Sequence, residues 1–557
     1  MHTVSLTGAG CPALNEAALQ LLAAEPRLRP GQSAPPEYYQ SNLLRAVEFV
    51  LERYAAVLPK NCAESLQQFV AANADSQRLL ARLLTRKGPY FLYSSLGYTE
   101  VADLEQALLE LAERGLITME PGPADALLQT VKKQHLCHSF NLSNPQRGLS
   151  KVQIVEYILG RYSDLAICRR IATQVPWVRL KHPEHWRLAR FLFFGTSGRD
   201  WSTFVLNDLG QTRFEVVPLG APLFAGAEGL ATLLAMQGLQ RASYRLDDFP
   251  LLAEALLKAL KQSRAGAIDG PRLHRCALRL GKWAEQRQQF DLALSAYKLA
   301  KVPPARERRV RILSRKGDAE SASKLLQHIL DQPRSAKERV FAERFGRRGA
   351  GFQPDTTVMP FTAMADSVEG YVLDKLLQGE GWGLHCENAL FKSFTGLLYW
   401  PIIFAAVEDA FTNPFQSGPH DLFAEDFCHR RRELLLEHED LLADDASLAQ
   451  FLATTLQQKQ GVANRLVSWS LFETVPLELW LSSIPAQVIR VLCAFLLRNL
   501  NDYRTGFPDL FLCYAPGEFE FIEVKGPGDQ LQPQQRAWFQ ILMQLELPAR
   551  VVKLQKS

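Results

Sequence analysis

The sequence lacks any cysteine pattern that would build a zinc site or a disulfide framework. Its nine cysteines are scattered over 557 residues without a C-x-x-C pair. Cys386 and Cys428 each adjoin a histidine, but adjacent residues alone do not make a zinc site, and no second pair follows. We therefore expect free thiols in a reducing cytoplasm.

Signals for secretion and for membrane insertion are also missing from the pattern. The stretch from Met1 to Ala17 has neither a basic segment nor an apolar core, so no signal peptide is predicted. The longest apolar run, Gly396 to Val407, is too short to cross a bilayer and contains Pro401. We interpret this run as a buried helix and expect no membrane association.

Over the whole chain, positive charges hardly outnumber negative ones. The formal net charge is +4, which does not by itself indicate a nucleic-acid partner. Hydrophobic residues make up 47% and charged residues 22%, as in an ordinary soluble protein. A chain of 557 residues is too long for one hydrophobic core, so several domains are predicted.

Within this ordinary composition, one stretch near the C-terminus carries a chemical pattern. Asp509 opens a short apolar run, and after a turn the residues up to Lys525 alternate between two faces, which predicts a β-hairpin. Glu523 and Lys525 then share one face, and Asp509 lies at the base of the partner strand. Two carboxylates and one ammonium group are therefore predicted to meet at one end of the hairpin.

This group of side chains suits metal-dependent hydrolysis of phosphodiesters. Mg²⁺ and Mn²⁺ prefer hard oxygen ligands, which Asp509 and Glu523 can supply, and a bound metal lowers the pKa of its water. Lys525 can position that water, and the glycines of Gly526-Pro527-Gly528 let a phosphate backbone approach. The same pattern also arises by chance at a solvated hairpin edge. The apolar strands around it and the glycines after it favour a functional site.

The stretch resembles the VRR-NUC branch of the PD-(D/E)xK nucleases, and most closely the bacterial form of the Fanconi-associated nuclease family. The matching residues are Pro508-Asp509 and Glu523-Val524-Lys525-Gly526-Pro527-Gly528-Asp529, with Gln535 and Trp538 beyond. A second matching block is His385-Cys386-Glu387-Asn388, then Phe391, then Gly396-Leu397-Leu398-Tyr399-Trp400. The family commonly has glycine where Asn388 stands, and Trp538 at helical spacing is also typical of a core residue.

The resemblance implies a set of catalytic and metal-binding residues. Glu387 would be a third acidic ligand, contributed by a helix, and the carbonyl of Val524 would complete a site for one or two Mg²⁺ or Mn²⁺ ions. Catalysis would rest on Glu387, Asp509, Glu523 and Lys525. The implied activity is that of a structure-selective 5′-flap endonuclease and 5′ to 3′ exonuclease of phosphodiesterase I type. It would act on branched or flapped DNA in interstrand crosslink repair.

Other implications of the resemblance concern location and partners. A bacterial family member would act in the cytoplasm, at the nucleoid. Eukaryotic relatives carry a ubiquitin-binding zinc finger, but no Cys/His set in this sequence can build one. Spacing and composition show no flap preference.

Two other functions remain open. One is a Holliday-junction resolvase of the same superfamily, although stand-alone resolvases are small dimers and this chain carries large additional domains. The other is a DNA-binding scaffold with a decayed site, against which the presence of all three acids and the lysine argues.

The predicted fold is multidomain and mostly α-helical. It comprises an N-terminal helical region (1–70), a winged-helix and SAP-like DNA-binding region (71–235), a tetratricopeptide-like basic array (236–355) and a VRR-NUC nuclease domain (356–557). The last is expected to be an α/β/α sandwich around a mixed sheet, preceded by a linker at 347–351 and containing an insertion with Pro and Gly turns at 409–427. Arg430–Arg432, just after the insertion, either reach the substrate or cap a helix C-terminus. Helices of the array are predicted at 273–287, 292–300, 305–314 and 319–330.

Two candidate DNA contacts lie in the second region. The order of a helix (78–84), a basic loop, a helix (103–114), Gly115 and a short strand (116–118) predicts a winged-helix unit. Arg86 and Lys87 lie in its basic loop, and they either grip the DNA backbone or simply solvate the helix end. The segment 136–159 resembles a SAP motif, in which Ser150 can cap a helix and Lys151 lies in its first turn. A helix N-terminus is a natural phosphate site.

The third candidate is the basic array. From Arg264 to Arg348 there are 21 Lys and Arg against 9 Asp and Glu, a charge of +12, so the rest of the chain sums to −8. Such an excess indicates a nucleic-acid surface, although basic helices can also face solvent or hold a protein partner. DNA is favoured because the nuclease follows in sequence. The densest residues are Arg306, Arg308, Arg309, Arg311, Arg315 and Lys316.

Overall fold

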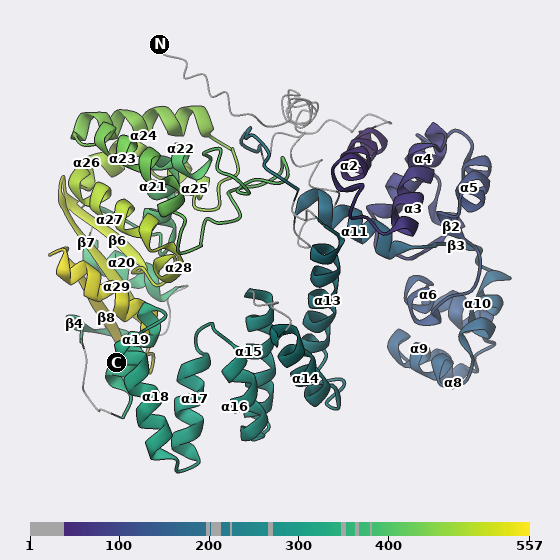
Figure 1. The fold of residues 1–557 in the computed structure, drawn as a ribbon, viewed down its shortest axis with the longest axis horizontal. Coiled ribbons are helices and arrows are strands. Elements are labelled where there is room, and N and C mark those ends of the chain that lie inside the picture. Colours follow the sequence, from purple (N-terminus) through teal and green to yellow (C-terminus); the bar gives the residue numbers. More distant parts are fainter. Residues whose placement is uncertain are drawn as a thin grey trace. The chain divides into compact units, whose positions relative to one another are not determined.

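The computed structural model describes residues 38–195, 201, 213–222, 226–265, 271–346, 352–361, 367–378 and 381–556 (Figure 1). The expected linker at 347–351 and the segment before Tyr38 lie outside these ranges. The chain divides into two compact units. The first comprises Met1–Ala227 with Glu408–Gln416, and the second comprises Glu228–Val407 with Ser417–Ser557.

The first unit begins with a helical layer over a small antiparallel sheet. Its helices are α2 (Tyr38–Tyr54), α3 (Lys60–Val70), α4 (Ala74–Leu84), α5 (Leu104–Glu113) and α11 (Pro183–Phe194). The strands β1 (Tyr90–Leu92), β2 (Ile117–Thr118) and β3 (Trp177–Leu180) pair in the order β1-β3-β2. The predicted succession of helix, basic loop, helix and short strand is present, with β1 and β3 as strands that the sequence pattern did not predict.

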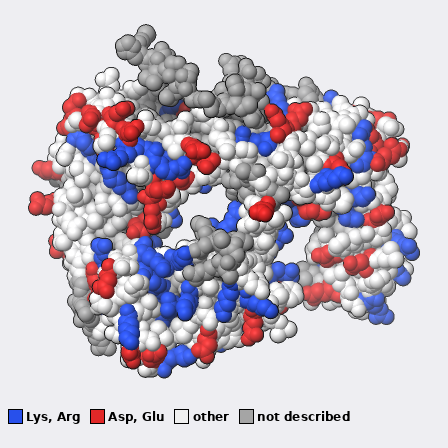
Figure 2. Space-filling view, in the orientation of Figure 1, with Lys and Arg blue, Asp and Glu red and all other residues white. Residues whose placement is uncertain are grey.

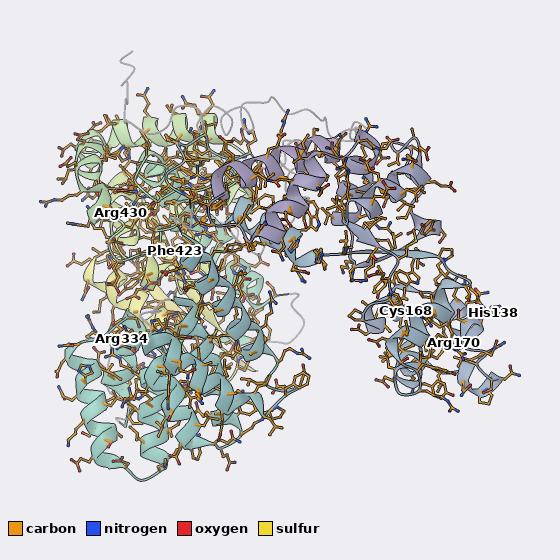
Figure 3. The ribbon with its side chains drawn as sticks, turned by 45° about the vertical axis from the view of Figure 1, so that its right-hand side comes forward. His138, Cys168, Arg170, Arg334, Phe423 and Arg430 are labelled. Carbon is orange, nitrogen blue, oxygen red and sulfur yellow. The ribbon has the colours of Figure 1, made fainter. Side chains whose placement is uncertain are left out.

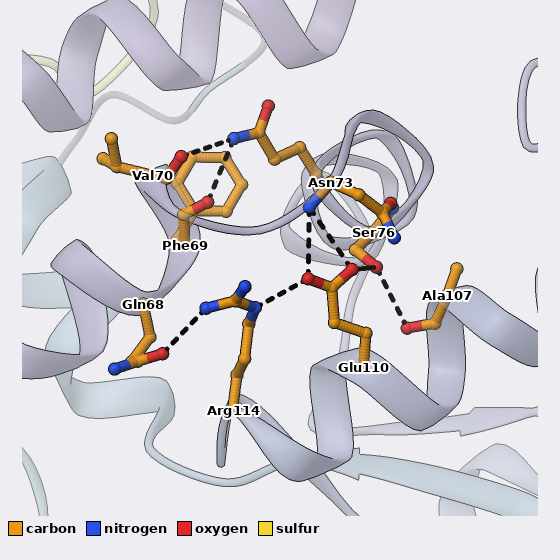
Figure 4. Close-up of polar contacts among 9 residues, drawn as sticks. Gln68, Phe69, Val70, Asn73, Ser76, Ala107, Glu110 and Arg114 are labelled. Atoms are coloured by element: carbon orange, nitrogen blue, oxygen red, sulfur yellow. Dashed lines mark hydrogen bonds and ion pairs between the residues drawn. The ribbon is translucent and has the colours of Figure 1, made fainter.

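A carboxylate joins the helices of this layer (Figure 4). Glu110 on α5 accepts hydrogen bonds from the Asn73 backbone N–H (3.2 Å) and the Ser76 hydroxyl (2.7 Å), at the start of α4. Arg114 donates to Glu110 at 2.7 Å and to Gln68 on α3 at 3.0 Å. The network satisfies donors at a helix N-terminus that would otherwise lack partners.

The SAP-like segment follows in the same unit. It consists of α6 (Ala124–Thr130), α7 (Lys133–Ser139), α8 (Asn144–Arg147), α9 (Lys151–Leu159) and α10 (Asp164–Ala172). Ser150 caps α9 as predicted, in a reciprocal capping box with Gln153. Exposed Arg170 on α10 lies over the Tyr162 ring at 4.8 Å, in the part of the unit that carries the labels His138 and Cys168 in Figure 3.

The second unit begins with the predicted helical array. Its members are α13 (Ala227–Tyr244), α14 (Leu252–Ala265), α15 (Pro271–Gln286), α16 (Phe290–Leu299), α17 (Ala305–Arg315), α18 (Ala319–Asp331) and α19 (Ala336–Arg344). Each of the four predicted helices is present within a few residues. Gly281 on α15 packs against Tyr297 on α16, where an added Cβ would lie 2.5 Å from the ring. This close approach explains the small residue inside a helix.

The nuclease core is a five-stranded mixed sheet in the order β4-β8-β7-β6-β5. The strands are β4 (Thr356–Phe361), β5 (Trp382–His385), β6 (Leu510–Ala515), β7 (Glu518–Lys525) and β8 (Ala549–Lys556). β4, β8 and β7 run parallel, whereas β6 is antiparallel to both β7 and β5. The hairpin is thus formed by the predicted residues, with Leu510 opposite Ile522.

Helices cover both faces of this sheet. Leu510, Leu512, Ile522 and Val524 pack with Val372 on α20 (Val368–Leu377). On the other face Phe521 contacts the rings of Phe391 on α21 (Ala389–Leu398) and of Phe507. Other helices of the unit are α23 (Arg432–Leu441), α24 (Asp445–Lys459), α25 (Trp469–Thr474), α26 (Leu477–Ser483), α27 (Ala486–Arg498), α28 (Leu500–Tyr503) and α29 (Pro533–Gln544).

The prediction of one buried helix at 396–407 is wrong. α21 ends at Leu398, and a separate short helix, α22 (Trp400–Ile403), follows with Pro401 in its first turn. Proline has no backbone N–H and fits a helix start better than a helix interior, so the chain breaks there. The run is nevertheless buried through Phe404 except at Pro401.

No single described helix has the length and apolar character to cross a membrane. α26 and α27 meet that test only as a pair, and they are bent by 101° at their junction.

Candidate active site

The hairpin places Asp509 against the end of β7. Asp509 immediately precedes β6, and its Oδ2 accepts a hydrogen bond from the Val524 backbone N–H at 2.9 Å. Its carbonyl oxygen accepts from the N–H groups of Cys386 (3.0 Å) and Glu387 (2.9 Å). Asp509 therefore ties the hairpin to the turn between β5 and α21.

Glu387 lies in that turn, two residues before α21 begins, and not within the helix as the resemblance implied. Its φ is 36°, a left-handed conformation that non-glycine residues rarely adopt and that costs of order 1–3 kcal/mol. Asn388 donates from Nδ2 to the Glu387 carboxylate at 2.7 Å and accepts at Oδ1 from the Phe507 N–H at 3.1 Å. The third acid is thereby oriented toward the start of the hairpin.

Glu523 is fully buried, and its two carboxylate oxygens have different surroundings. Lys525 Nζ lies 2.6 Å from Oε1, and the Gln535 amide on α29 donates to the same oxygen. Oε2 is buried without a hydrogen-bond partner among the described residues. An unpaired buried carboxylate oxygen is costly, so this atom marks a position for a proton or a cation.

The charge of Lys525 alone does not stabilise the ionised forms of both Asp509 and Glu523. Burial, together with repulsion from Asp509, raises the pKa of Glu523 to about 8. Burial also raises the pKa of Asp509, against the hydrogen bond from the Val524 N–H and the charge of Lys525. Two carboxylates whose ionised forms are disfavoured, beside one lysine, form a site that a divalent cation would stabilise.

The donor set fits a divalent metal that prefers oxygen. Three carboxylates, one of them with an unpaired oxygen, are the ligands expected for Mg²⁺ or Mn²⁺. The ligand oxygens of Glu387, Asp509 and Glu523 do not all lie within 4.8 Å of one another. In this structure, Lys525 and Gln535 both contact Oε1 of Glu523.

The sequence pattern missed two members of the site's surroundings, Asn388 as a positioning residue and Lys392 as a cation. Lys392 is half-buried on α21, and burial lowers its pKa despite the nearby charge of Glu387. It lies five residues beyond Glu387, a spacing that carries no motif. Gln535 was weighed only through the family pattern, and its contact with Glu523 shows why that residue type matters here. Trp538 is a core residue, 1% exposed, whose indole N–H donates to the Tyr503 carbonyl.

The candidate DNA contacts of the first unit lie at the surface. Arg86 is exposed and donates to the Ser95 carbonyl (3.0 Å) and the Tyr98 hydroxyl (2.9 Å), which holds its loop in place. Lys87 is exposed. Lys151 is half-exposed, and its ammonium donates to the Gln129 carbonyl at 2.6 Å.

Arg306 corrects the prediction for the basic array. Its side chain is 5% exposed, and its guanidinium pairs with the buried Glu338 and donates to the Gln332 carbonyl at 2.9 Å. A buried arginine that is paired in this way links α17 to α19 and offers nothing to a phosphate. A count of charges along the sequence does not distinguish a buried arginine such as Arg306 from its exposed neighbours.

The other basic residues in and just after α17 are more accessible. Arg308, Arg311 and Lys316 form partly exposed ion pairs with Glu285 (3.4 Å), Glu307 (3.1 Å) and Asp291 (2.6 Å). Arg309 is half-buried, and burial lowers its pKa. Arg315 is exposed and makes no ion pair with the described residues. Figure 2 shows Lys and Arg gathered over this array, with acidic side chains between them.

Two arginines after the predicted insertion are structural. The interpretation that Arg430–Arg432 reach the substrate or cap a helix C-terminus is wrong for Arg431, which is fully buried and pairs with Asp421 at 2.8 Å. Arg430, labelled in Figure 3, contacts the same carboxylate at 2.8 Å. The predicted insertion, 409–427, contains no helix or strand and is held by such contacts.

Two family models match the chain. The VRR-NUC domain matches residues 443–555, which include the hairpin and α29 but not Glu387. The model described as "FAN1, HTH domain" matches residues 37–118, which include α2 to β2.

Curated proteins and solved structures match over nearly the whole length. The chain is 30% identical to the Fanconi-associated nuclease 1 homolog of Pseudomonas aeruginosa, over 93% of this chain and 95% of that protein. It is 24% identical to the homolog of Arabidopsis thaliana, over 93% of this chain and 67% of that protein. A crystal structure of paFAN1 bound to DNA with a 2-nucleotide 5′ flap and a gap superposes with a TM-score of 0.82 at 28% identity, covering 94% of this chain and 99% of that chain.

Proposed function

The chain belongs to the Fanconi-associated nuclease family, and from this premise we propose that it is a 5′-flap endonuclease and 5′ to 3′ exonuclease acting in interstrand crosslink repair. Membership and the VRR-NUC domain make it a structure-selective DNA nuclease. The observation that carries the proposal is the meeting of Asp509, Glu523 and Lys525 at one end of the hairpin, with Glu387 tied to it. The flap preference is supported by the similarity to paFAN1, crystallised with 1- and 2-nucleotide 5′ flaps.

VRR-NUC nucleases depend on a divalent metal, and we propose Mg²⁺ or Mn²⁺ here, held by Glu387, Asp509, Glu523 and the Val524 carbonyl. When bound, the metal offsets negative charge on the phosphate and lowers the pKa of the attacking water. Lys525 orients that water at the scissile phosphate. Lys525 is poised for this role because its Nζ already lies at the Glu523 carboxylate, 2.6 Å away.

Two residues act through the ligands. The Val524 N–H fixes the Asp509 carboxylate, and Gln535 fixes one oxygen of Glu523 so that the other is presented to the site. Such positioning partners commonly affect metal affinity or activity by about 10- to 100-fold when removed.

The test compares three substrates, a 5′-flapped duplex, a 3′-flapped duplex and a four-way junction, each with Mn²⁺ and with EDTA. We expect metal-dependent cutting that favours the 5′ flap and falls at least about 100-fold in Asp509→Ala. The matched control is Glu518→Ala, an exposed carboxylate at the far end of β7. DNA binding is measured in parallel, so that loss of chemistry is separated from loss of affinity.

Other outcomes would reject the proposal in defined ways. Symmetrical cutting of the junction alone would indicate a resolvase, and binding without cutting would indicate a scaffold. Retained cutting in both Asp509→Ala and Glu523→Ala would reject the site assignment. For the cellular role, cells whose only copy of this protein carries Asp509→Ala should be more sensitive to a DNA crosslinker than cells with the wild-type chain. Equal resistance of the two would reject the proposed role in crosslink repair.

A further inference from the structure

A second group of metal-ligand side chains lies in the first unit, where β3 leads into α11. The sequence there is His-Pro-Glu-His, residues 182–185. His182, Glu184 and His185 each offer a ligand atom, and the three atoms lie within 4.8 Å of one another. No other three histidine, cysteine or acidic residues in the described ranges meet this condition.

His185 is the fixed member of the group, and its hydrogen bonds determine which nitrogen is available. The residue is 6% exposed, and its Nδ1 lies 2.8 Å from the Ser65 hydroxyl on α3. The same hydroxyl lies 3.1 Å from the Asn61 carbonyl, which can accept its only proton. With that proton on the Asn61 carbonyl, Ser65 Oγ accepts from His185 Nδ1–H, and the Nε2 lone pair of the neutral ring is free.

This arrangement is the one found around metal-binding histidines. Such a histidine usually donates from one ring nitrogen to a nearby oxygen, which sets the tautomer and the ring orientation while the other nitrogen binds the metal. The Nε2 atom of His185 makes no hydrogen bond to any described residue. The contact of Nδ1 with Ser65 thus fixes the direction of the Nε2 lone pair, and no described residue donates a hydrogen bond to it.

His182 and Glu184 are the adjustable members. The two imidazole rings stack with centroids 4.7 Å apart and planes at 20°. His182 Nδ1 lies 3.3 Å from the Glu184 carboxylate, and the two side chains are 42% and 57% exposed. Small rotations of these partly exposed side chains are enough to bring two donors onto a cation beside His185.

We propose that His182, Glu184 and His185 bind one Zn²⁺ ion, with water as the fourth ligand. Two imidazole nitrogens and one carboxylate are a common zinc donor set, whereas Mg²⁺ avoids nitrogen ligands. His185 would then link the ion to Ser65 on α3, next to the place where Trp186 packs on Phe69 at 5.5 Å. It is independent of the nuclease metal, whose ligands all lie in the second unit.

The experiment measures bound zinc in the full-length chain carrying Asp509→Ala and Glu523→Ala, so that the nuclease site contributes little. The protein is stripped with EDTA, dialysed against Zn²⁺ in excess Mg²⁺, and analysed for metal content and for affinity against a chromophoric chelator. His182→Ala and Glu184→Gln are added separately in that background. His138→Ala, an exposed histidine of the same unit, is the control.

We expect one zinc per chain in the background protein and in the His138→Ala control. The affinity should fall about 100-fold in His182→Ala and at least 10-fold in Glu184→Gln. Zinc should raise the melting temperature of the background protein but not of His182→Ala, and bound Co²⁺ should give a tetrahedral visible spectrum. Failure to bind zinc would overturn the proposal, as would equal binding by all variants. Neither result depends on nuclease activity.

Discussion

The buried Glu523 carboxylate should make the metal-free protein less stable at alkaline pH, and Glu523→Gln should remove that penalty. The variant keeps the shape of the side chain and an oxygen that can accept from Lys525 and Gln535. Its amide N–H₂ replaces the oxygen that has no partner. We therefore expect Glu523→Gln to be more stable than the wild type when no metal is present.

The pH dependence follows from the sign of the pKa shift. The pKa of Glu523 is raised by burial and by Asp509 from 4.5 to about 8. A raised carboxyl pKa means that the folded state holds the proton more tightly than the unfolded state, so stability falls as pH rises from about 4.5 to 8. At 1.36 kcal/mol per unit, the upper limit of the penalty is about 1.4 kcal/mol at pH 5.5 and about 4 kcal/mol at pH 8.

The assay is thermal unfolding of the full chain in EDTA at pH 5.5 and pH 8.5. Glu523→Gln should gain several degrees at pH 8.5 and much less at pH 5.5. Glu520→Gln, which removes a paired carboxylate from the same strand, should show no gain that grows with pH. Saturating Mn²⁺ should then raise the melting temperature of the wild type and not of Glu523→Gln. A variant that is equally stable or less stable than wild type at pH 8.5 would refute the reasoning.

Three further substitutions separate structural from functional roles. Arg306→Ala should destabilise the protein by about 3 to 5 kcal/mol, because it leaves Glu338 buried without its partner; an unfolding curve like that of the wild type would contradict this. Arg315→Ala should change stability by less than about 0.5 kcal/mol and make the salt dependence of DNA binding shallower by about one phosphate contact; an unchanged slope would remove Arg315 from the DNA surface. Gln535→Ala should lower kcat/KM about 10- to 100-fold with flap binding intact. Equal losses of cutting and binding would show that Gln535 contacts DNA instead of orienting Glu523.

The parts of the fold that the sequence predicted well are those determined locally. The hairpin between Asp509 and Lys525 is specified by 17 consecutive residues, in which strand-like patterns of apolar side chains flank a turn. The cap at Ser150 and the helices of the array depend on spacings of three to four residues, and their ends match within a few positions. In each case the residues that form the pattern are the same neighbouring residues that form the hairpin, the cap or the helix.

The parts that were missed depend on contacts distant in sequence. Arg306 is buried because Glu338, 32 residues away, neutralises it inside the array. A count of charges along the chain treats it as equal to Arg315, although only one of them faces solvent. The break after Leu398 is a different case, because its cause is local: Pro401 lies in the first turn of a second helix, and the predicted single helix ran through it. Local patterns predict that a segment is basic or apolar, but not which of its side chains the tertiary fold turns inward.

The turn at Glu387 shows how nearby residues of this chain stabilise an unfavourable conformation at the site. The left-handed backbone of Glu387 is held by its own N–H and that of Cys386, which both donate to the Asp509 carbonyl. Asn388, where the resembled family commonly has glycine, has an ordinary right-handed conformation with φ of −71°, so this position does not require glycine. Its side chain instead connects the Glu387 carboxylate to the Phe507 N–H, two residues before Asp509. Since glycine has no side chain, the asparagine adds a link that couples the orientation of the third acid to the start of the hairpin.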